Sequence, residues 1–551
     1  MNRSLVARAD AYLSGEQGTV FKDPGGRISI CLIYPNIYRV GMANLGFQGI
    51  YGLLNKRDDV VCERAFLPDE QDMALHIRTG TPLFSLESKR SVTAFDIAAF
   101  SIPFEIDYPN ILRILDCAKI PFLSVRRDRF HPLLIAGGVC PSFNPEPIAP
   151  VFDLMFIGDG EESLDEFLEK YKTAMNTAGG KEAVKRASVS IEGVYVPDYY
   201  TVQYNNDGTL AGRTPLHGAT ATIRRRCLGE LSSASVTTSI ISSESEFSNM
   251  YLIEAMRGCP WSCRFCLVGH LYRPVRKKEI SVVKDEIGRA GQLQGEGRLK
   301  IGLIGPSLTD YAYAKEVLGI RGVDFSITSL RAGAKSAELV ELLKRHKSIS
   351  IAPEAGTERM RTVINKKISE NDILETSARV LEAGVDTLRL YFMIGLPTET
   401  EEDISGIVAL TRKIRQTSKK GMLVLSVSTF VPKPLTPFQW HGMEPLSAVK
   451  EKLKFIKKEL RDEGSIKVFH DVPKYAHLQG LFARGDRRVF KVIEAMTKTE
   501  DMKKACSEAG IDMAFYVFRK RDFQEILPWD FIEADIPKER LWGEYSEALS
   551  T

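Results

Sequence analysis

The chain has 551 residues, 44% of them hydrophobic and 26% charged, and its 74 basic and 71 acidic side chains give a net charge of +3. This near balance excludes a strongly basic protein that holds nucleic acid through bulk charge, and the sequence has no strong nucleic-acid signature. No apolar run reaches the roughly 18 residues of a membrane span, and acidic residues interrupt the N-terminus where a secretory signal has its apolar core. We therefore expect a cytoplasmic, enzyme-sized protein.

Short apolar runs alternate with helical patterns over the first part of the chain. This alternation predicts an α/β fold with a parallel, doubly wound, Rossmann-like sheet, which we assign to residues 1–190. Glycine-bearing loops follow two of the strands, at the edge where such sheets bind ligands, although glycine there also serves plain tight turns. The expected strands are Arg27–Pro35, Val60–Pro68, Ala94–Pro103, Pro132–Val139 and Phe152–Ile157, and the expected helices are Asn44–Lys56, Tyr108–Ala118 and Glu161–Tyr171.

Residues 191–248 are assigned to a connector. Ile191–Arg226 is β-rich and irregular. Leu231–Ser248 is rich in serine and threonine, which is typical of a linker or a wrapping loop.

Regular strand–helix alternation follows the connector. Six units are fewer than the eight of a closed barrel, so we predict a partial, open (β/α)6 barrel over residues 249–465. The charged, mixed tail at residues 466–551 is assigned to a small C-terminal α+β domain. The expected strands are Tyr251–Met256, Leu299–Ile304, Asp324–Leu330, Ser348–Ala352, Thr387–Ile394 and Leu423–Val431, and the expected helices are Val282–Leu293, Tyr311–Leu318, Ser336–Arg345, Asp372–Glu382, Glu401–Gln416 and Ala448–Arg461.

Three of the nine cysteines fall within the segment RGCPWSCRFC, with the spacing C-x3-C-x2-C. Zinc sites normally use four ligands in two separated pairs, and His270 stands at a poor spacing for a fourth ligand. Three thiolates suit a cubane iron–sulfur cluster with one iron left open for chemistry. The segment also leaves the end of the first barrel strand, where βα barrels carry their active sites. Structural zinc and three simply buried thiols are the alternative interpretations.

This segment resembles the radical S-adenosylmethionine (SAM) superfamily. In that superfamily SAM chelates the open iron, and one electron from the cluster cleaves its sulfonium bond to give a 5′-deoxyadenosyl radical that abstracts hydrogen from the substrate. The resemblance implies that Cys259, Cys263 and Cys266 ligate a 4Fe–4S cluster and that Phe265 packs near the adenine.

Other strand ends resemble SAM-contacting positions of the superfamily. Glu354 would accept hydrogen bonds from the ribose, unless it forms an ion pair with Arg359 or Arg361. Gly395 resembles the glycine that lets the backbone approach the adenine, or it simply makes a turn. The full set of candidate SAM contacts is Phe265, Ser329, Arg331, Glu354, Arg389 and Gly395.

The first domain, standing before such a barrel, resembles the cobalamin-binding module of the cobalamin-dependent radical SAM group. The candidate cobalamin contacts are Ser101, Gly137, Gly138 and Gly158. The D-x-H-x-x-G motif, whose histidine ligates cobalt in many cobalamin proteins, is absent, and the N-terminal half offers only His76 and His131. This departure leaves open a vestigial domain without the cofactor. The resemblance rests on Phe95–Tyr108, Leu134–Pro150 and Phe152–Glu162, and an uncharacterised bacterial and archaeal subfamily is suggested by Tyr34–Tyr51, Arg484–Arg488 and Leu527–Asp530.

The leading functional hypothesis is a cobalamin-dependent radical SAM methyltransferase that acts on an unactivated carbon of an unknown substrate. A flavodoxin or ferredoxin would supply the electron. The first alternative is another radical modification, such as sulfur insertion, rearrangement or C–C bond formation, on an RNA, peptide or lipid precursor. The second is a non-catalytic redox or cobalamin sensor. Because radical intermediates must be kept from water, we expect the tail or Leu231–Ser248 to close the site.

Overall fold

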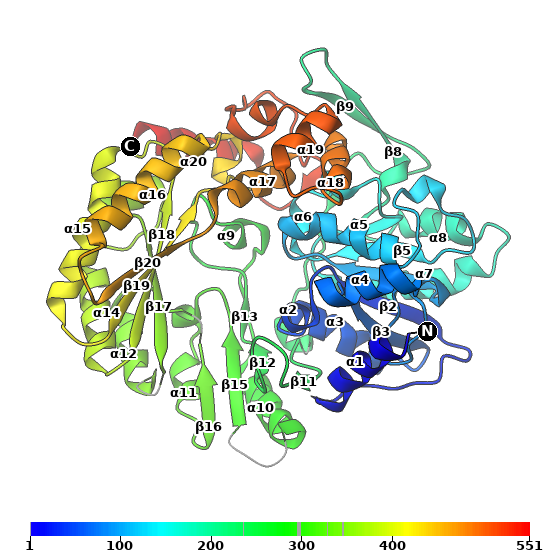
Figure 1. Cartoon of the computed structure of the whole chain (residues 1–551), viewed down its shortest axis with the longest axis horizontal. Coiled ribbons are helices and arrows are strands. Elements are labelled where there is room, and N and C mark those ends of the chain that lie inside the picture. Colours follow the sequence, from blue (N-terminus) through cyan, green and yellow to red (C-terminus); the bar gives the residue numbers. More distant parts are fainter. Residues whose placement is uncertain (1, 235, 295–298, 328, 344–345) are drawn as a thin grey trace.

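The computed structural model describes residues 2–234, 236–294, 299–327, 329–343 and 346–551. Two lobes lie side by side, an N-terminal α/β lobe and an arc of barrel strands, and the C-terminal helices run along both (Figure 1). In these ranges, no helix is both long and apolar enough to cross a bilayer.

The N-terminal lobe is built on a six-stranded sheet. Its strand order is β3 (Val60–Phe66), β2 (Ile28–Tyr34), β4 (Ile97–Ser101), β5 (Leu133–Gly137), β6 (Leu154–Phe156) and β7 (Val194–Tyr195). The first five are parallel and β7 is antiparallel, which confirms the doubly wound prediction. The chain steps from β2 to β3 on one side and then to β4 on the other. This reversal opens a crevice at the carboxyl ends of β2 and β4, where ligands bind in such sheets.

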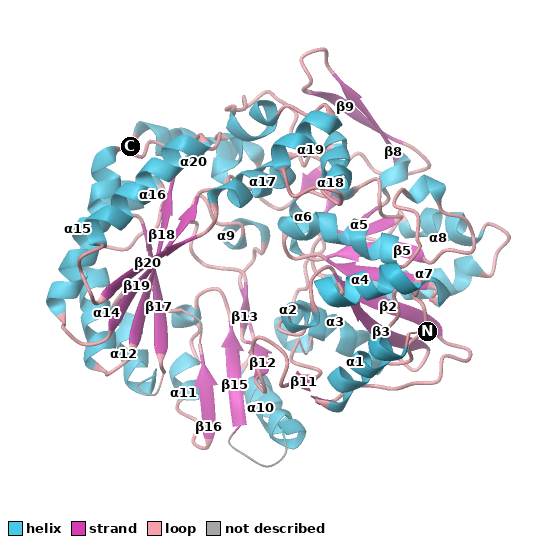
Figure 2. Cartoon of the chain, viewed as in Figure 1, coloured by secondary structure: helices cyan, strands magenta, loops and turns pink. Residues whose placement is uncertain are grey.

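Helices pack against both faces of this sheet, and its strands are accordingly buried almost continuously (Figure 2). The helices are α1 (Arg3–Ser14), α2 (Tyr38–Gly41), α3 (Leu45–Lys56), α4 (Glu70–Thr79), α5 (Tyr108–Cys117), α6 (Val139–Phe143), α7 (Gly160–Met175) and α8 (Gly180–Ser188). The helix α3 begins at Asn44, whose side chain accepts a hydrogen bond from the Phe47 N–H at 2.9 Å. This cap aims the start of α3 at the crevice.

The second lobe is an open arc of parallel strands in two sheets. One contains β12 (Tyr251–Glu254), β15 (Leu299–Ile304) and β16 (Val323–Ser326), and the other contains β17 (Ser348–Glu354), β18 (Thr387–Ile394), β19 (Met422–Thr429) and β20 (Ile466–His470). A parallel bridge between Leu330 and Ile351 joins the two sheets. The partial barrel is therefore confirmed, with one strand more than expected. That strand, β20, lies in the range given to the C-terminal domain but pairs in parallel with β19.

Helices cover the outer, convex face of the arc. They are α10 (Ile280–Gln294), α11 (Ala314–Leu318), α12 (Ala334–Val340), α14 (Glu370–Glu382), α15 (Glu401–Thr417) and α16 (Leu446–Leu460), whereas α13 (Glu358–Val363) packs against residues 538–550 near the end of the chain. Along β18, Leu388, Leu390 and Phe392 are buried in the core, while Arg389 and Tyr391 alternate with them. The alternate residues therefore line the concave face. The expected strand Asp324–Leu330 and helix Ser336–Arg345 include positions 328 and 344–345, which lie outside the described residues.

The connector and the tail tie the lobes together. The hairpin β8 (Tyr200–Tyr204) and β9 (Leu210–Pro215) projects outward, and β10 (Ile223–Arg224) pairs with β21 (Ile532–Glu533) of the tail. The segment after it contributes β11 (Ile241–Ser242), which pairs with β1 (Glu16–Gln17). Beyond β20 the described tail comprises α17 (Pro473–Arg484), α18 (Phe490–Ala495), α19 (Met502–Ala509) and α20 (Lys538–Ser550), together with the short strand β21.

Candidate active site between the lobes

The three clustered cysteines lie on the loop that follows the first barrel strand. After β12, the short β13 (Met256–Arg257) pairs with β14 (Arg276–Lys277) and so encloses the loop and α9 (Val268–Leu271). Gly258 opens the loop with a φ of +82°, and a Cβ there would collide with the carbonyl oxygen of Tyr272. Only glycine fits this position, because both the backbone conformation and the space exclude a side chain.

Each thiol has its own hydrogen-bond donors or cations. Burial raises the pKa of all three thiols, that of Cys266 to about 11. The backbone N–H of Trp261 acts in the opposite direction on Cys259, and those of Gly269 and Val268 do so on Cys266. At Cys263 the charges of Lys366 and Arg331 lower the pKa of the thiol in the same way. Donors placed at sulfur are what a thiolate-held iron–sulfur cluster uses to stabilise its charge.

This donor set fits a cluster better than a single ion. Among the described residues, no three His, Cys, Asp or Glu side chains converge as they would around one metal ion. The three thiols still interact electrostatically with one another, so they face a common space. In a cubane each thiolate binds a different iron, so the three sulfurs lie farther apart than they would around one metal ion. The residues present therefore fit a 4Fe–4S cluster with one open iron.

Side chains from neighbouring elements fix the cysteine loop. The Asn365 amide donates to the Ser262 carbonyl at 2.9 Å, and Arg264 donates to the Val363 carbonyl at 2.9 Å. Arg273 donates to the Ser262 hydroxyl and to the Gly269 carbonyl, both at 2.6 Å. The loop is thus held in one shape before any cofactor binds, as a precise coordination site requires.

The expected SAM contacts lie around this loop and along the concave face. Phe265 packs half-buried against the larger apolar core, and Ser329 and Arg331 follow β16. Glu354 ends β17 with a φ of +68° and pairs with Lys366 at 2.9 Å. The alternative pairing with Arg359 or Arg361 is therefore wrong. Arg359 pairs with Asp403, and Arg361 donates to backbone carbonyls.

The other two expected contacts lie on β18 and just beyond it. Arg389 reaches across the concave face and donates to the Ser426 hydroxyl at 3.1 Å. Gly395 has a φ of +79°, and its N–H donates to Glu399 at 2.8 Å. A positive φ explains glycine at this turn, and the roles of both residues toward SAM stay predictions.

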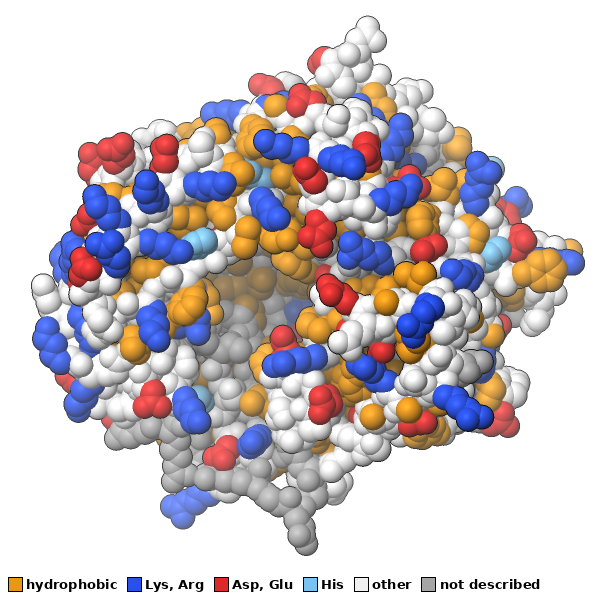
Figure 3. Space-filling view, in the orientation of Figure 1, with side chains coloured by type: hydrophobic (Ala, Val, Ile, Leu, Met, Phe, Trp, Pro, Cys, Tyr) orange, Lys and Arg blue, Asp and Glu red, His pale blue; other side chains and the backbone are white. Residues whose placement is uncertain are grey.

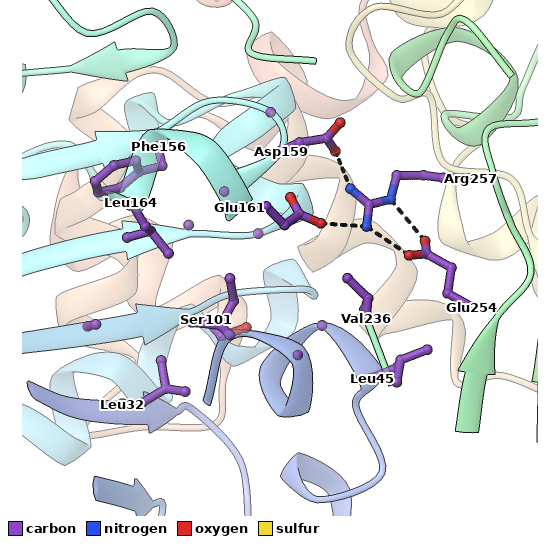
Figure 4. A pocket seen from close by; sticks show the side chains of 18 of the residues that line it. Leu32, Leu45, Ser101, Phe156, Asp159, Glu161, Leu164, Val236, Glu254 and Arg257 are labelled. Atoms are coloured by element: carbon purple, nitrogen blue, oxygen red, sulfur yellow. Dashed lines mark hydrogen bonds and ion pairs between the residues drawn. The ribbon is translucent and has the colours of Figure 1, made fainter. Parts of the chain in front are cut away.

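A cavity of about 430 Å³ lies between the sheet of the N-terminal lobe and the start of the barrel. Its first wall is formed by the carboxyl ends of the strands and by α3 and α7, and its second by residues 254–258 and 304–306 (Figure 4). The lining is mainly apolar and glycine-rich. All four expected cobalamin contacts line it: Ser101, Gly137, Gly138 and Gly158.

Two of these positions also require glycine because of the backbone conformation. Gly138 and Gly158 have φ values of +109° and +105°, and a Cβ on either would collide with a backbone carbonyl, of Ile102 and Arg226 respectively. Gly137 differs, because a Cβ added to it would meet no atom closer than the Phe156 Cβ at 3.8 Å. Its missing side chain is therefore the one that leaves room in the cavity.

Arg257 links the two walls. Its guanidinium donates to Asp159 at 2.9 Å, to Glu161 at 2.7 Å and to Glu254 at 2.8 Å (Figure 4). Arg276 forms a second ion pair with Asp159. Burial works against these charges, yet the arginines hold the pKa of Asp159 below its usual range. The loop after β6 is thereby fixed to the strand that leads into the cysteine loop.

Two protein families match the chain. Residues 46–197 match the family described as radical SAM proteins, N-terminal, and residues 253–411 match the radical SAM superfamily. This chain belongs to the radical SAM superfamily. Membership makes it a radical SAM enzyme and implies a 4Fe–4S cluster and SAM as its cofactors.

Individual relatives of this radical SAM enzyme match to different extents. An uncharacterised protein of Methanocaldococcus jannaschii is 29% identical over 85% of this chain and 90% of its own length. The tRNA-2-methylthio-N(6)-dimethylallyladenosine synthase of Chloroherpeton thalassium is 24% identical over 29% of this chain and 38% of the synthase. The structure of the cobalamin-dependent S-adenosylmethionine radical enzyme OxsB, with aqua-cobalamin and S-adenosylmethionine bound, is 13% identical with a TM-score of 0.49. That match covers 90% of this chain and 64% of OxsB.

Sequence reasoning missed Arg257 in this radical SAM enzyme. Its position directly before Gly258 and Cys259 gives no sign of its partners, because Asp159 and Glu161 lie about a hundred residues away. The only local signal is the acidic run that follows Gly158, which is equally typical of the start of a helix. No histidine is among the described residues that line the cavity, in agreement with the missing D-x-H-x-x-G motif.

Proposed function

We propose that this radical SAM enzyme methylates an unactivated carbon atom and uses cobalamin in the cavity between the lobes as the methyl carrier. The observation that carries the proposal is the position of that cavity. Its first wall is the ligand-binding edge of a doubly wound sheet, and its second wall runs directly into the cysteine loop. A carrier held there would face the site where the radical is formed.

The cavity's size and lining support a cofactor that turns an apolar face toward the protein. Its volume of about 430 Å³ and its apolar lining fall within the range of cofactor sites. The glycines at the strand ends let the backbone approach a ring system closely. Because no described lining residue is a histidine, cobalamin would bind there without a histidine ligand from this wall.

The chain's own residues are proposed to have two roles at the cluster side. Cys259, Cys263 and Cys266 hold the cluster, and the Glu354–Lys366 pair, Arg389 and Gly395 surround SAM. When bound, the cluster supplies the electron that cleaves SAM, and cobalamin supplies the methyl group. A flavodoxin or ferredoxin is the proposed donor of that electron.

The tail is proposed to keep water from the cysteine loop. Glu547 of α20 accepts a hydrogen bond from Arg264 of the loop at 2.7 Å, so the last helix rests on it. The described part of the other expected cover, Leu231–Ser248, joins the two lobes, because Gln48 bonds to the backbone of Ser239 and Ile240 and the Thr238 N–H donates to the Leu252 carbonyl of β12 at 3.0 Å. Removal of α20 should therefore uncouple SAM cleavage from product formation, measured as 5′-deoxyadenosine released per product; unchanged coupling would contradict the role of the tail.

The proposal is tested by anaerobic purification with cobalamin supplied, followed by assays of iron, sulfide and the visible cobalamin bands. Two variants separate the two sites. Cys263→Ala should lose iron and keep cobalamin, whereas Gly137→Phe, which fills the cavity where there is room, should keep about four irons and lose cobalamin. Incorporation of label from methyl-labelled SAM then identifies substrates. Wild-type protein that retains four irons but no cobalamin would contradict the proposed carrier and methyl transfer, while leaving the radical SAM assignment intact.

A further inference from the structure

Arg331 does not point freely into the SAM site but packs against the cysteine loop. Its guanidinium carbon lies 3.6 Å from the centre of the Trp261 ring, and Trp261 stands between Cys259 and Cys263. The same guanidinium donates to the Lys367 carbonyl at 3.1 Å and to the Lys366 carbonyl. Three contacts thus fix the cation beside the loop.

This fixed cation acts on two of the three thiols. The guanidinium is close enough to Cys263 and Cys259 to interact with both thiols by charge. Lys366 is a second cation that acts on Cys263.

The surrounding charges leave an excess of positive charge at this end of the loop. Lys366 is matched by Glu354 at 2.9 Å. Asp310 accepts a hydrogen bond from the Trp261 indole at 2.6 Å and is matched by Lys335 at 3.3 Å. Because Lys277 also donates to the Asp310 backbone carbonyl at 2.6 Å, four cations including Arg331 surround these two carboxylates, and positive charge is in excess.

Such a charge has a defined effect on a cluster held by these cysteines. One-electron reduction adds a negative charge to the cluster, and a fixed cation in a partly buried site stabilises that charge. Net charge and hydrogen bonds to sulfur are what set the reduction potential of iron–sulfur clusters. We propose that Arg331 is a positioning residue that raises the reduction potential of the cluster, through Cys263 and Cys259, and that it is not a ligand of SAM. The inference rests on the proposed cluster at the three cysteines and is independent of cobalamin and of methyl transfer.

The two possible roles of Arg331 give different measurements. A SAM ligand sets the affinity for SAM and leaves the potential of the SAM-free cluster unchanged. A charge beside the thiolates sets that potential in the absence of SAM. The experiment is an anaerobic potentiometric titration of the full-length, reconstituted protein without SAM, followed by electron paramagnetic resonance, with SAM affinity measured separately on the same preparations.

Arg331→Gln should shift the potential to a more negative value with the iron content kept, and Arg331→Lys should restore most of the shift. SAM affinity should change less than about threefold in both variants, which corresponds to under ~0.7 kcal/mol. An unchanged potential in Arg331→Gln would overturn the proposal, most directly if SAM binding weakens about tenfold or more.

A second variant keeps the proposal testable if Arg331→Gln does not assemble the cluster. Asp310→Asn removes a negative charge near Arg331 and retains an oxygen that accepts from Trp261, so it should shift the potential in the positive direction. Lys335→Gln is the control at an exposed site, with 73% of its side chain exposed, and should have a much smaller effect. A negative shift or no shift in Asp310→Asn overturns the proposal. Absence of iron in the wild-type protein would instead refute the cluster assignment itself.

Discussion

Single residues decide whether the cysteine loop can form. Gly258 combines a positive φ with a carbonyl oxygen where a Cβ would lie, and neither condition is visible in the sequence. The three cysteines were predictable because their spacing is local and chemically specific. The Glu354 pairing with Lys366 was not predictable, because a bulge between Ile351 and Glu354 turns the carboxylate away from the following helix.

Gly258→Ala should therefore disrupt the loop. The strain of an alanine at this φ costs about 1–3 kcal/mol, and the collision adds to it, so both the iron content and the free energy of unfolding should fall. Gly288→Ala is the matched control, because Gly288 lies in α10 with no atom near its Cβ position. That control should be neutral or stabilising by up to about 1 kcal/mol. Normal iron content in Gly258→Ala would show that the loop tolerates a different conformation.

The buried carboxyl of Asp107 predicts that the free energy of unfolding depends on pH. Burial raises the pKa of this carboxyl to about 6, although the amides of Asn36 and Asn110 donate to it and lower the pKa. A pKa raised by folding means that the folded state binds the proton more tightly. The stability from this group is therefore fully present below its ordinary pKa and is lost as the pH rises through about 6.

Asp107→Asn removes this titration and keeps an oxygen for both amides. Between about pH 5 and about pH 7.5, the free energy of unfolding of the wild type should fall by about 1 kcal/mol relative to the variant. Denaturant unfolding at a series of pH values measures the difference. Parallel curves for the two proteins over that range would mean that the carboxyl is ionised throughout.

At the scale of elements, the prediction from sequence succeeded where a strand is buried on both faces. The strands β2, β4, β5 and β6 are mainly apolar runs, whereas β3 carries the buried Glu63 and Arg64, and each of the five was located from sequence. The helix α4 was missed because its only buried residue is His76, so it has no apolar stripe. The strand β20 was missed because Ile466–His470 exposes Lys467 and Phe469 on the concave face, which resembles the pattern of a surface segment. A local pattern of apolar residues reveals a buried strand, but it does not reveal which strand pairs with it.

The ion pairs of Arg257 join β13 to the loop after β6, and their contribution to stability can be measured. Arg257→Ala leaves Asp159, Glu161 and Glu254 facing one another in a mostly buried site. Breaking a buried ion pair from one side costs about 3–5 kcal/mol, so the free energy of unfolding should drop by roughly that amount. Arg461→Ala, at an exposed ion pair with Asp462, is the control and should cost less than about 1 kcal/mol. Equal losses in the two variants would contradict a special role for Arg257.

At the scale of the whole molecule, contacts distant in sequence set the two lobes face to face. Lys433 of the barrel pairs with the buried Glu105 of the N-terminal lobe, and Arg487 of the tail pairs with Glu146 at 2.9 Å. With Arg257 these pairs fix the cavity against the cysteine loop, and Figure 3 shows that the molecule is hollowed near the centre of this face. The sequence predicted both modules. It contained no local signal for their relative placement, because the pairs join segments that are far apart in the chain.

The central claim is that the cavity and the cysteine loop form one site. The most direct test is the magnetic interaction between a reduced cluster and paramagnetic cob(II)alamin bound to the same anaerobic protein, measured by the relaxation rate of the cobalt signal. The account predicts faster relaxation in the wild type than in Cys263→Ala, which keeps cobalamin but lacks the cluster. Identical relaxation in two preparations that both contain cobalamin, with a reduced cluster in only one, would contradict a shared site.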